Sequence, residues 1–271
     1  MTNNFSLQEN VAEEFGVRLS HPAPGVAEVR LDRPSKLNAL NDEMYRAIYE
    51  IFGALHEDRS VRAVIVSGSG RGFCSGSDIG GMLKTSGPAA RARLQRRHAA
   101  IQAVGRIEKP VIAAVQGPAA GIGFALAMAC DLIVAADTAY FQLGFRDVGL
   151  VPDGGTIYFL SQRLGIGRAK DLVMTGRRLP APEALEWGAI NRVMPAEDLG
   201  RSSLALAVEL AAAPTYVLGL SKKMFTASSS PSLETVLELE SYAASVARSS
   251  SDHKEGVAAF REKRKPQFSG E

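Results

Sequence analysis

Short apolar runs and amphipathic segments alternate through the first half of the chain. Val26 to Leu31 alternates loosely between apolar and polar residues and predicts a first strand. Three further runs have the length and composition of buried strands: Val61 to Val66, Val111 to Val115 and Leu132 to Ala136. After the first run, Asn41 precedes a segment whose apolar residues recur at helical spacing from Met44 to Leu55, as expected of a capped helix with one buried face. A second apolar stripe predicts a helix before the third strand: Leu94, Ile101, Val104 and Ile107. The pattern predicts alternating strands and helices.

The region Lys109–Gly155 has the pattern of a reactive site. A glycine-rich turn with Gly121 and Gly123 joins an apolar strand to a small-residue helix from Phe124 to Ala129. A second glycine-rich turn, at the end of the region, carries Asp153. Without a Cβ the backbone can approach a ligand closely, and the first N–H groups of a helix are unpaired. These N–H groups favour an anion or a developing oxyanion.

Beyond residue 155 the chain changes to mainly helical patterns. One short strand is predicted at Ile190 to Met194, and Asp252 with Glu255 resembles a capping box for a last helix. The predicted helical segments are 167–175, 182–188, 196–213, 215–227 and 232–248. Strands and helices followed by helices alone indicate an α/β core with a helical C-terminal region. We place the core at residues 1–200 and the helical region at 201–271.

Composition narrows the classes of protein that fit. The 271 residues are 46% hydrophobic and carry a net charge of +2, which gives no reason to expect a nucleic-acid partner. Two cysteines predict no disulfide framework and favour a cytoplasmic location, and the polar, acidic N-terminus lacks the features of a signal peptide. Pro110 to Cys130 contains no charged residue. Its glycines, Gln116 and Pro118 nevertheless favour a buried strand, turn and helix over a membrane span.

Several common kinds of catalytic site are absent from the sequence. The glycines of Gly68–Gly72 do not match a dinucleotide-binding fingerprint, and there is no Walker motif or nucleophile elbow. The histidines are not spaced as metal ligands, so no metal site is predicted. His98 is expected on a solvated helix face beside Arg96 and Arg97, and Cys74 as a small buried residue.

Five segments, taken together and in order, resemble the crotonase (enoyl-CoA hydratase/isomerase) superfamily. They are RLDRPSKLNAL (Arg30–Leu40), GFCSGSDI (Gly72–Ile79), KPVIAAVQGPAAGIGFALAMACD (Lys109–Asp131), GLVPDGG (Gly149–Gly155) and EGVAAFREKRKPQF (Glu255–Phe268). Within the family, AAGIGFALAMACD, FRDVGLVPD and PTYVLGLSKK look most like the phenylacetate-pathway ring-epoxide isomerase branch. The resemblance implies a spiral of β-β-α units, with C-terminal helices that build homotrimers, often paired into hexamers, and cover the coenzyme A site.

The resemblance also implies an oxyanion hole for the oxygen of an acyl-CoA thioester. Its two backbone N–H donors would be those of Ser77, in the GFCSGSD segment, and Ile122, in the central glycine turn. The hydratases of the family add two glutamates. Those positions align with Ala125 and Phe145, which cannot transfer a proton, so a two-carboxylate hydration with these residues is excluded.

Asp153 is the remaining candidate for acid/base chemistry. The isomerase branch uses an aspartate at this position, and one carboxylate is chemically sufficient to move a proton between two carbons. The alternative is that Asp153 is an N-cap of the following helix. Asp147 is a second candidate for the base, and an ordinary exposed loop position is its alternative interpretation.

The remaining implied contacts are with the substrate. The family pattern places Lys36, Ser75, Asp78, Phe260 and Lys263 near coenzyme A, the last two acting across a subunit interface. No separate cofactor is expected, because coenzyme A is part of the substrate. Residues 80–90 are expected to select the acyl group. The predicted function is isomerisation of an enoyl-CoA or ring-modified acyl-CoA; a hydratase with other acid/base groups and a catalytically silent CoA-binding protein are the alternatives.

Overall fold

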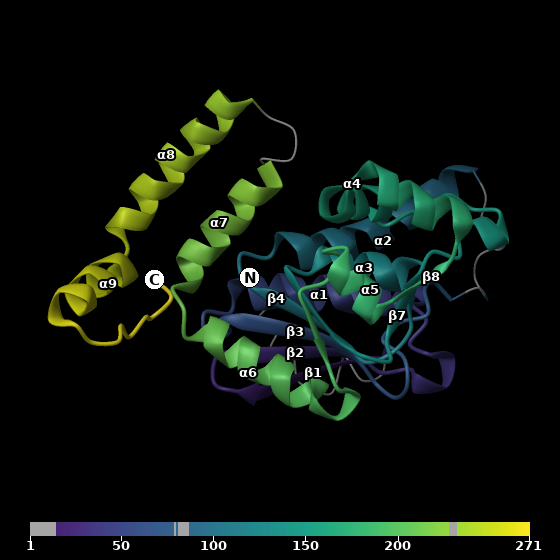
Figure 1. Cartoon of the computed structure of the whole chain (residues 1–271), viewed down its shortest axis with the longest axis horizontal. Coiled ribbons are helices and arrows are strands. Elements are labelled where there is room, and N and C mark those ends of the chain that lie inside the picture. Colours follow the sequence, from purple (N-terminus) through teal and green to yellow (C-terminus); the bar gives the residue numbers. More distant parts are fainter. Residues whose placement is uncertain (1–14, 79, 81–86, 228–231) are drawn as a thin grey trace, which may run out of the picture.

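The protein is an α/β fold built around a six-stranded main sheet (Figure 1). The computed structural model describes residues 15–78, 80, 87–227 and 232–271. Strands follow the order β1-β2-β3-β4-β6-β9, in which β1 and β2 are antiparallel and the others are parallel. Their bounds are β1 Val17–Ala23, β2 Val26–Leu31, β3 Ala63–Gly68, β4 Val111–Val115, β6 Leu132–Ala136 and β9 Arg192–Met194.

A second, smaller sheet lies beside the first and completes the β-β-α spiral. Its strands are β5 (Ala119–Ala120), β7 (Tyr140–Gln142) and β8 (Arg178–Pro180), and β5 is parallel to β7. Parallel bridges between Cys74 and Ala119, and between Leu40 and Ser77, continue this layer. The loop before residue 78 is therefore attached to the same layer as the turn that follows β4.

Helices pack on both faces of the main sheet. On one face, α1 packs against α2, α2 against α3 and α3 against α4, while α6 packs on β2, β3, β4 and β6 from the opposite side (Figure 1). The helices are α1 Asp42–Glu57, α2 Gly87–Arg106, α3 Ile122–Ala129, α4 Thr156–Thr175, α5 Ala181–Glu186, α6 Leu199–Ala211, α7 Thr215–Ala227, α8 Leu233–Ser249 and α9 Ser251–Glu262. The short 3-10 helices are η2 Pro34–Lys36, η4 Arg146–Val148 and η5 Ala196–Asp198.

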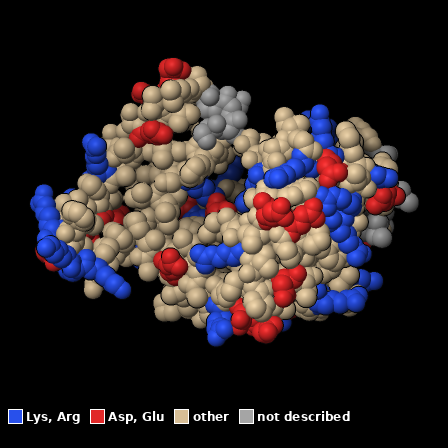
Figure 2. Space-filling view, in the orientation of Figure 1, with Lys and Arg blue, Asp and Glu red and all other residues tan. Residues whose placement is uncertain are grey.

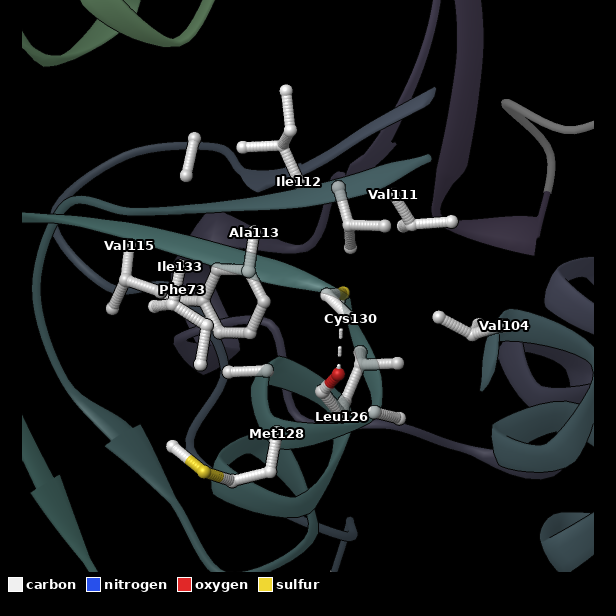
Figure 3. Close-up of a cluster of buried hydrophobic side chains, with 14 of the residues drawn as sticks. Phe73, Val104, Val111, Ile112, Ala113, Val115, Leu126, Met128, Cys130 and Ile133 are labelled. Carbon is white, nitrogen blue, oxygen red and sulfur yellow. Dashed lines mark hydrogen bonds between the residues drawn. The ribbon is translucent and has the colours of Figure 1, made fainter. Parts of the chain in front are cut away.

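Strand β4 and helix α3 form the centre of the core. Every residue of both elements is buried, and their side chains meet those of Phe73, Val104 and Ile133 (Figure 3). The thiol of Cys130 donates to the carbonyl of Leu126 at 3.4 Å, which satisfies a polar group at the end of α3. The uncharged segment 110–130 is thus a buried strand, turn and helix, as predicted.

Within the described part of the chain, no single helix is long and apolar enough to cross a membrane. Helices α6 and α7 meet that criterion only as a pair, and the pair is bent by 102°.

Helices α7, α8 and α9 form an arm that projects from the core (Figure 1). Since α6 packs on the main sheet, the projecting part begins at α7. The chain after α9 folds back to the base of the arm, where the Asp252 carboxylate accepts from the backbone N–H groups of Ser269 and Gly270 at 2.7 and 2.8 Å. Arg62 of the core donates to the carbonyl of Phe268 at 2.9 Å. The C-terminal residues therefore connect α9 to the core.

Some predicted boundaries and local motifs differ from the structure. The capping box at Asp252 and Glu255 is wrong: Ser250 caps α9 by accepting from the N–H of His253, and Glu255 binds Arg264. Helix α4 starts well before the predicted segment and is interrupted at Gly165. The predicted loop 80–90 is described only in part, because residues 81–86 lie outside the described residues. Residues 87–90 form the start of α2, and Gly80 has a 3-10 helical conformation.

Candidate active site

The loop that contains Ser77 and the turn that contains Ile122 lie against each other. The N–H of Ala120 donates to the carbonyl of Cys74 at 2.8 Å, and the N–H groups of Phe73 and Cys74 donate to Pro118. Glycines permit the approach, since a Cβ at Gly123 would lie 2.3 Å from the Cys74 carbonyl oxygen. These backbone bonds hold the two segments side by side, so the loop that carries Ser77 lies against the turn that leads into Ile122, the first residue of α3.

Neither of these two backbone N–H groups has a hydrogen-bond acceptor among the described residues. The Ile122 N–H belongs to the first residue of α3, where the helix dipole favours a negative charge. The Gly76 carbonyl accepts from Leu40 at 2.8 Å, which turns the N–H of Ser77 to the opposite side of the same peptide. Two fixed, unused donors are what an enolate oxygen requires.

Asp153 lies next to this pair of amides. It is followed by Gly154, whose Cβ would fall 1.9 Å from Ile122 Cδ1 and 3.6 Å from Ala125 Cβ, so no larger residue fits there without a shift. The Asp153 Oδ1 atom is buried and has no hydrogen-bond partner. Burial raises the pKa of Asp153, against the lowering effects of His98 and Arg97. The carboxylate is therefore more basic than an exposed aspartate.

The N-cap interpretation of Asp153 is wrong. The N-cap of α4 is Gly155, and the Asp153 side chain makes no capping bond. Thr156 donates instead to the backbone carbonyl of Asp153, through its N–H at 3.1 Å and its hydroxyl at 2.5 Å. The backbone carbonyl of Asp153 thus supports the helix start, while its side chain makes no capping bond.

His98 is the main residue that the sequence interpretation misplaced. It is half-buried on α2, its Nε2 atom is buried without a partner, and its charge acts on Asp153. The expected solvated face is wrong because His98 falls at helical spacing between Leu94 and Ile101, on the stripe of α2 that faces the core. That spacing is the feature of the sequence that could have identified it.

The positions aligned with the hydratase glutamates also face this site. Ala125 contacts the turn at Gly154, and the Phe145 ring lies 3.9 Å from the Cβ position of Gly121. Both are apolar, so they add no acid or base. Asp147 lies in the short 3-10 helix η4, where it is exposed and forms an ion pair with Arg146 at 3.4 Å.

The expected coenzyme A residues fall into two separated groups. Ser75 donates to the Lys36 carbonyl at 3.2 Å, while Asp78 accepts from Gly80 N–H at 3.0 Å and from Arg33 at 3.1 Å. Those two bonds hold the pKa of Asp78 below its usual value. The Lys36 side chain is exposed beside these residues, and we call the group Lys36, Ser75 and Asp78 the Lys36 rim.

Phe260 and Lys263 lie on the distant arm instead. Phe260 is 86% exposed, and Lys263 is the exposed residue after α9. Basic side chains gather at the tip of the arm, where Lys263 is joined by Arg261, Arg264 and Lys265 (Figure 2). Helix α9 lies on the arm, away from the core of the same chain (Figure 1).

A cleft of about 1110 Å³ separates the arm from the core (Figure 2). Helices α2, α3, α4 and α7 line it; His98 and Gly154 lie at its wall, whereas Ser77, Ile122 and Asp153 do not. Further along, Lys222 pairs with Asp131 at 2.8 Å. The two amide donors, Ser77 and Ile122, do not line this cleft. We therefore place the reaction centre at these amides and Asp153, and not in the cleft.

A metal site has no support among the described residues, since no three His, Cys, Asp or Glu side chains are grouped there.

Burial raises the pKa of the Cys74 thiol to about 12, so it is a poor nucleophile at neutral pH. Cys74 is buried, as the sequence predicted.

Comparisons with known proteins place this arrangement in a family. A family model for enoyl-CoA hydratase/isomerase matches residues 22–271. The chain is 38% identical over 256 residues to the 1,2-epoxyphenylacetyl-CoA isomerase of Escherichia coli (strain K12), covering 93% of this chain and 98% of that protein. It is 37% identical to 4-chlorobenzoyl coenzyme A dehalogenase-1 of Arthrobacter sp, covering 80% of each. An enoyl-CoA hydratase structure from Bacillus anthracis superposes with a TM-score of 0.90 at 30% identity, covering 94% of this chain and 100% of the other.

The protein belongs to the enoyl-CoA hydratase/isomerase family, the crotonase superfamily, and binding of an acyl-CoA thioester is consistent with this family. The resemblance and the fold class predicted from the sequence are both confirmed. The names of its relatives include an isomerase and a dehalogenase, so membership alone leaves the individual reaction open.

Proposed function

We propose that the protein is an acyl-CoA isomerase that moves a proton between two carbons through an enolate. The observation that carries the proposal is the Asp153 carboxylate, whose Oδ1 atom is buried without a partner, in the turn that packs on Ile122 through Gly154; Ala125 and Phe145 occupy the two hydratase positions. The similarity to a relative named as a 1,2-epoxyphenylacetyl-CoA isomerase supports it. The proposed substrate carries an enoyl or a ring-modified acyl group.

The reaction uses one base twice. Asp153 takes a proton from one substrate carbon, the electron pair moves onto the thioester oxygen, and the Ser77 and Ile122 amides hold the negative charge. Asp153 then returns its proton to a second carbon, so no atoms are gained or lost. Partial burial and the apolar side chains of Ala125 and Phe145 limit water near the carboxylate, which raises its basicity and disfavours hydration.

Coenzyme A binding is proposed to need more than one subunit. The Lys36 rim lies by the loop that carries Ser77, which we call the oxyanion loop. Phe260 and the basic residues around Lys263 lie on the arm. In a homotrimer or homohexamer, a neighbour's arm would bring those cations to the phosphates and the Phe260 ring to the adenine. Sedimentation of the protein together with Lys263→Ala kinetics tests this arrangement.

The direct test is turnover with a β,γ-enoyl-CoA. We expect wild-type protein to give the α,β-isomer, and Asp153→Asn to be about 10²–10⁴-fold slower, the usual contribution of a positioned acid or base. Asp147→Asn is the matched control, because it removes the other loop aspartate. Retained turnover in Asp153→Asn, with loss in Asp147→Asn, would move the base to Asp147. Accumulation of a 3-hydroxyacyl-CoA would instead indicate a hydratase, and binding without turnover a silent protein.

A second candidate function follows from the nearness of His98 to Asp153. A carboxylate can act as a nucleophile, and an imidazole can activate water to release the covalent intermediate. On a halogenated aromatic acyl-CoA, Asp153 would displace halide from the ring to form an aryl ester. Water activated by His98 would then cleave the ester at the carboxyl carbon. The similarity to a relative named as a 4-chlorobenzoyl coenzyme A dehalogenase supports this candidate.

Halide release distinguishes the two candidates. Incubation with 4-chlorobenzoyl-CoA should give chloride and a hydroxybenzoyl-CoA only if the second candidate holds. In a single turnover in ¹⁸O-water, the label would then enter the Asp153 carboxylate, and His98→Gln would trap the ester. With no chloride and an active β,γ-enoyl-CoA assay, the isomerase proposal stands.

A further inference from the structure

A hydroxyl pair lies directly behind the first amide of the oxyanion hole. Tyr45, on α1, is only 2% exposed, and its phenolic oxygen is 2.9 Å from the Ser77 hydroxyl. This bond joins α1 to the loop that presents the Ser77 N–H. The phenol is the only side-chain partner recorded for the Ser77 hydroxyl among the described residues.

A buried arginine holds the tyrosine from the other side. The Arg97 guanidinium, on α2, lies 5.0 Å from the centroid of the Tyr45 ring, which is within the range of a cation–π contact. Arg97 is 7% exposed, and its Nε and Nη2 donate to one oxygen of Asp42 at 2.9 and 2.8 Å. Arg93 donates to the same carboxylate. Tyr45 is therefore fixed between two helices by packing, by charge and by one hydrogen bond.

Either hydroxyl can be the donor in this hydrogen bond, and the phenol keeps the proton that it needs to donate. Burial raises the pKa of Tyr45 well above its usual range, so the phenol keeps its proton and can donate to Ser77. The electrostatic effect of Asp153 acts in the same direction, which places the phenol near the reaction centre. A neutral donor of fixed position restrains the Ser77 side chain without competing for its N–H.

The peptide that carries the Ser77 N–H needs such a restraint. It follows Gly76, whose φ of 112° is accessible mainly to glycine and allows the peptide plane alternative orientations. Backbone bonds from the Leu40 N–H to the Gly76 carbonyl and from the Asp78 N–H to the Leu40 carbonyl hold the chain on either side of Ser77, and the Tyr45 hydroxyl adds a restraint on the Ser77 side chain. An oxyanion hole works through donors that need no rearrangement when charge develops.

We propose that Tyr45 is a positioning residue of the oxyanion hole, and that its hydroxyl holds Ser77 so that the backbone N–H stays directed at the substrate oxygen. Arg97 and Asp42 hold Tyr45 in place, which links the hole to the helix that carries His98. This inference rests on the proposed function only in that the hole must bind an enolate. Tyr45 itself does not touch the reacting atoms.

The enolate of a bound β-ketoacyl-CoA measures the hole directly, because the enolate absorbs in the near ultraviolet. We expect Tyr45→Phe to lower the enolate fraction at a fixed pH by about three- to tenfold, the equivalent of one neutral hydrogen bond. Binding of a saturated acyl-CoA should not change. Tyr49→Phe is the matched control, since this residue of the same helix is 54% exposed. Melting curves show that each variant is folded.

Ser77→Ala removes the same hydrogen bond from its other end and keeps the backbone N–H. We expect the same loss of enolate as in Tyr45→Phe, and no further loss in the double variant. Additive losses, or an unchanged enolate fraction in a folded Tyr45→Phe, would overturn the inference. If wild-type protein binds the β-ketoacyl-CoA but stabilises no enolate, that result rejects the proposed function. A normal enolate signal in wild-type protein and in folded Tyr45→Phe would reject only the role of Tyr45.

Discussion

The close approach of α3 to the oxyanion loop makes Gly123→Ala a severe test of the site. The new Cβ would lie 2.3 Å from the Cys74 carbonyl oxygen and 2.7 Å from Cys74 Cβ, both inside contact distance. The oxygen belongs to the backbone and accepts from Ala120 at 2.8 Å, so relief requires the two segments to separate. The substitution should therefore damage stability and the amide geometry together.

The magnitude follows from opposing contributions. Alanine in a helix gains about 1 kcal/mol over glycine. Overpacking costs about 1–3 kcal/mol and occasionally more, and weakening the Ala120 bond adds about 1 kcal/mol. The expected net destabilisation is about 1–3 kcal/mol, or a fall in Tm of about 3–10 °C for a chain of this size.

The matched control is Gly53→Ala, in the middle of α1, where a Cβ would meet nothing within 4 Å. That variant should be unchanged or slightly more stable, with a normal enolate signal. Gly123→Ala should melt lower and lose most of the enolate signal at temperatures where it is folded. If it melts with the control and keeps the signal, the packing argument for the two amides is wrong.

Other outcomes follow from charges in the structure. Burial raises the pKa of Asp153, and the base must be ionised; turnover should therefore fall with decreasing pH through a midpoint above the ordinary 3.8, as a pH–rate profile will show. Partial burial alone would raise the pKa of Asp42, but hydrogen bonds from Arg97 and Arg93 outweigh it and lower the pKa. The ionised Asp42 carboxylate therefore stabilises the folded protein fully at pH values above its pKa in the unfolded chain. This contribution is lost as the pH falls through its lower pKa in the folded protein. Because the Asp42 side chain is half exposed and solvent screens these pairs, Asp42→Asn should be less stable by at most about 1 kcal/mol at pH 7 in urea unfolding, and equal to wild type in acid. Lys263→Ala should raise KM about three- to tenfold and flatten its salt dependence, with kcat unchanged; equal KM at low salt would leave the arm tip outside the CoA site.

Much of the main sheet could be predicted because β3, β4 and β6 are short, almost wholly buried apolar runs, and β2 alternates between buried and more exposed residues. Strands β2, β3, β4 and β6 were recognised in this way. β1 was missed because His21 and Pro22 interrupt its alternation, and β5, β7 and β8 have too few residues to show a period. The second layer is held by pairing with distant segments, which no local pattern contains.

The chemistry was partly predictable for a similar reason. Ser77, Ile122 and Asp153 stand in local motifs, and the structure brings them to one place. Arg97 and His98 occur in a basic segment that looks solvated. Arg97 is buried because Asp42, 55 residues earlier, pairs with it, and Asp252 is taken by the C-terminal tail rather than by a helix cap. Such partners are visible only once the chain is folded.

The central claim is that Asp153 moves the proton. Exchange of substrate α- and γ-protons with deuterated solvent, followed by mass spectrometry, tests it without requiring net turnover. Wild-type protein and Asp147→Asn should exchange at similar rates, and Asp153→Asn about 10²–10⁴-fold more slowly with no fall in Tm at pH 7. Exchange at the wild-type rate in a folded Asp153→Asn protein would contradict the account.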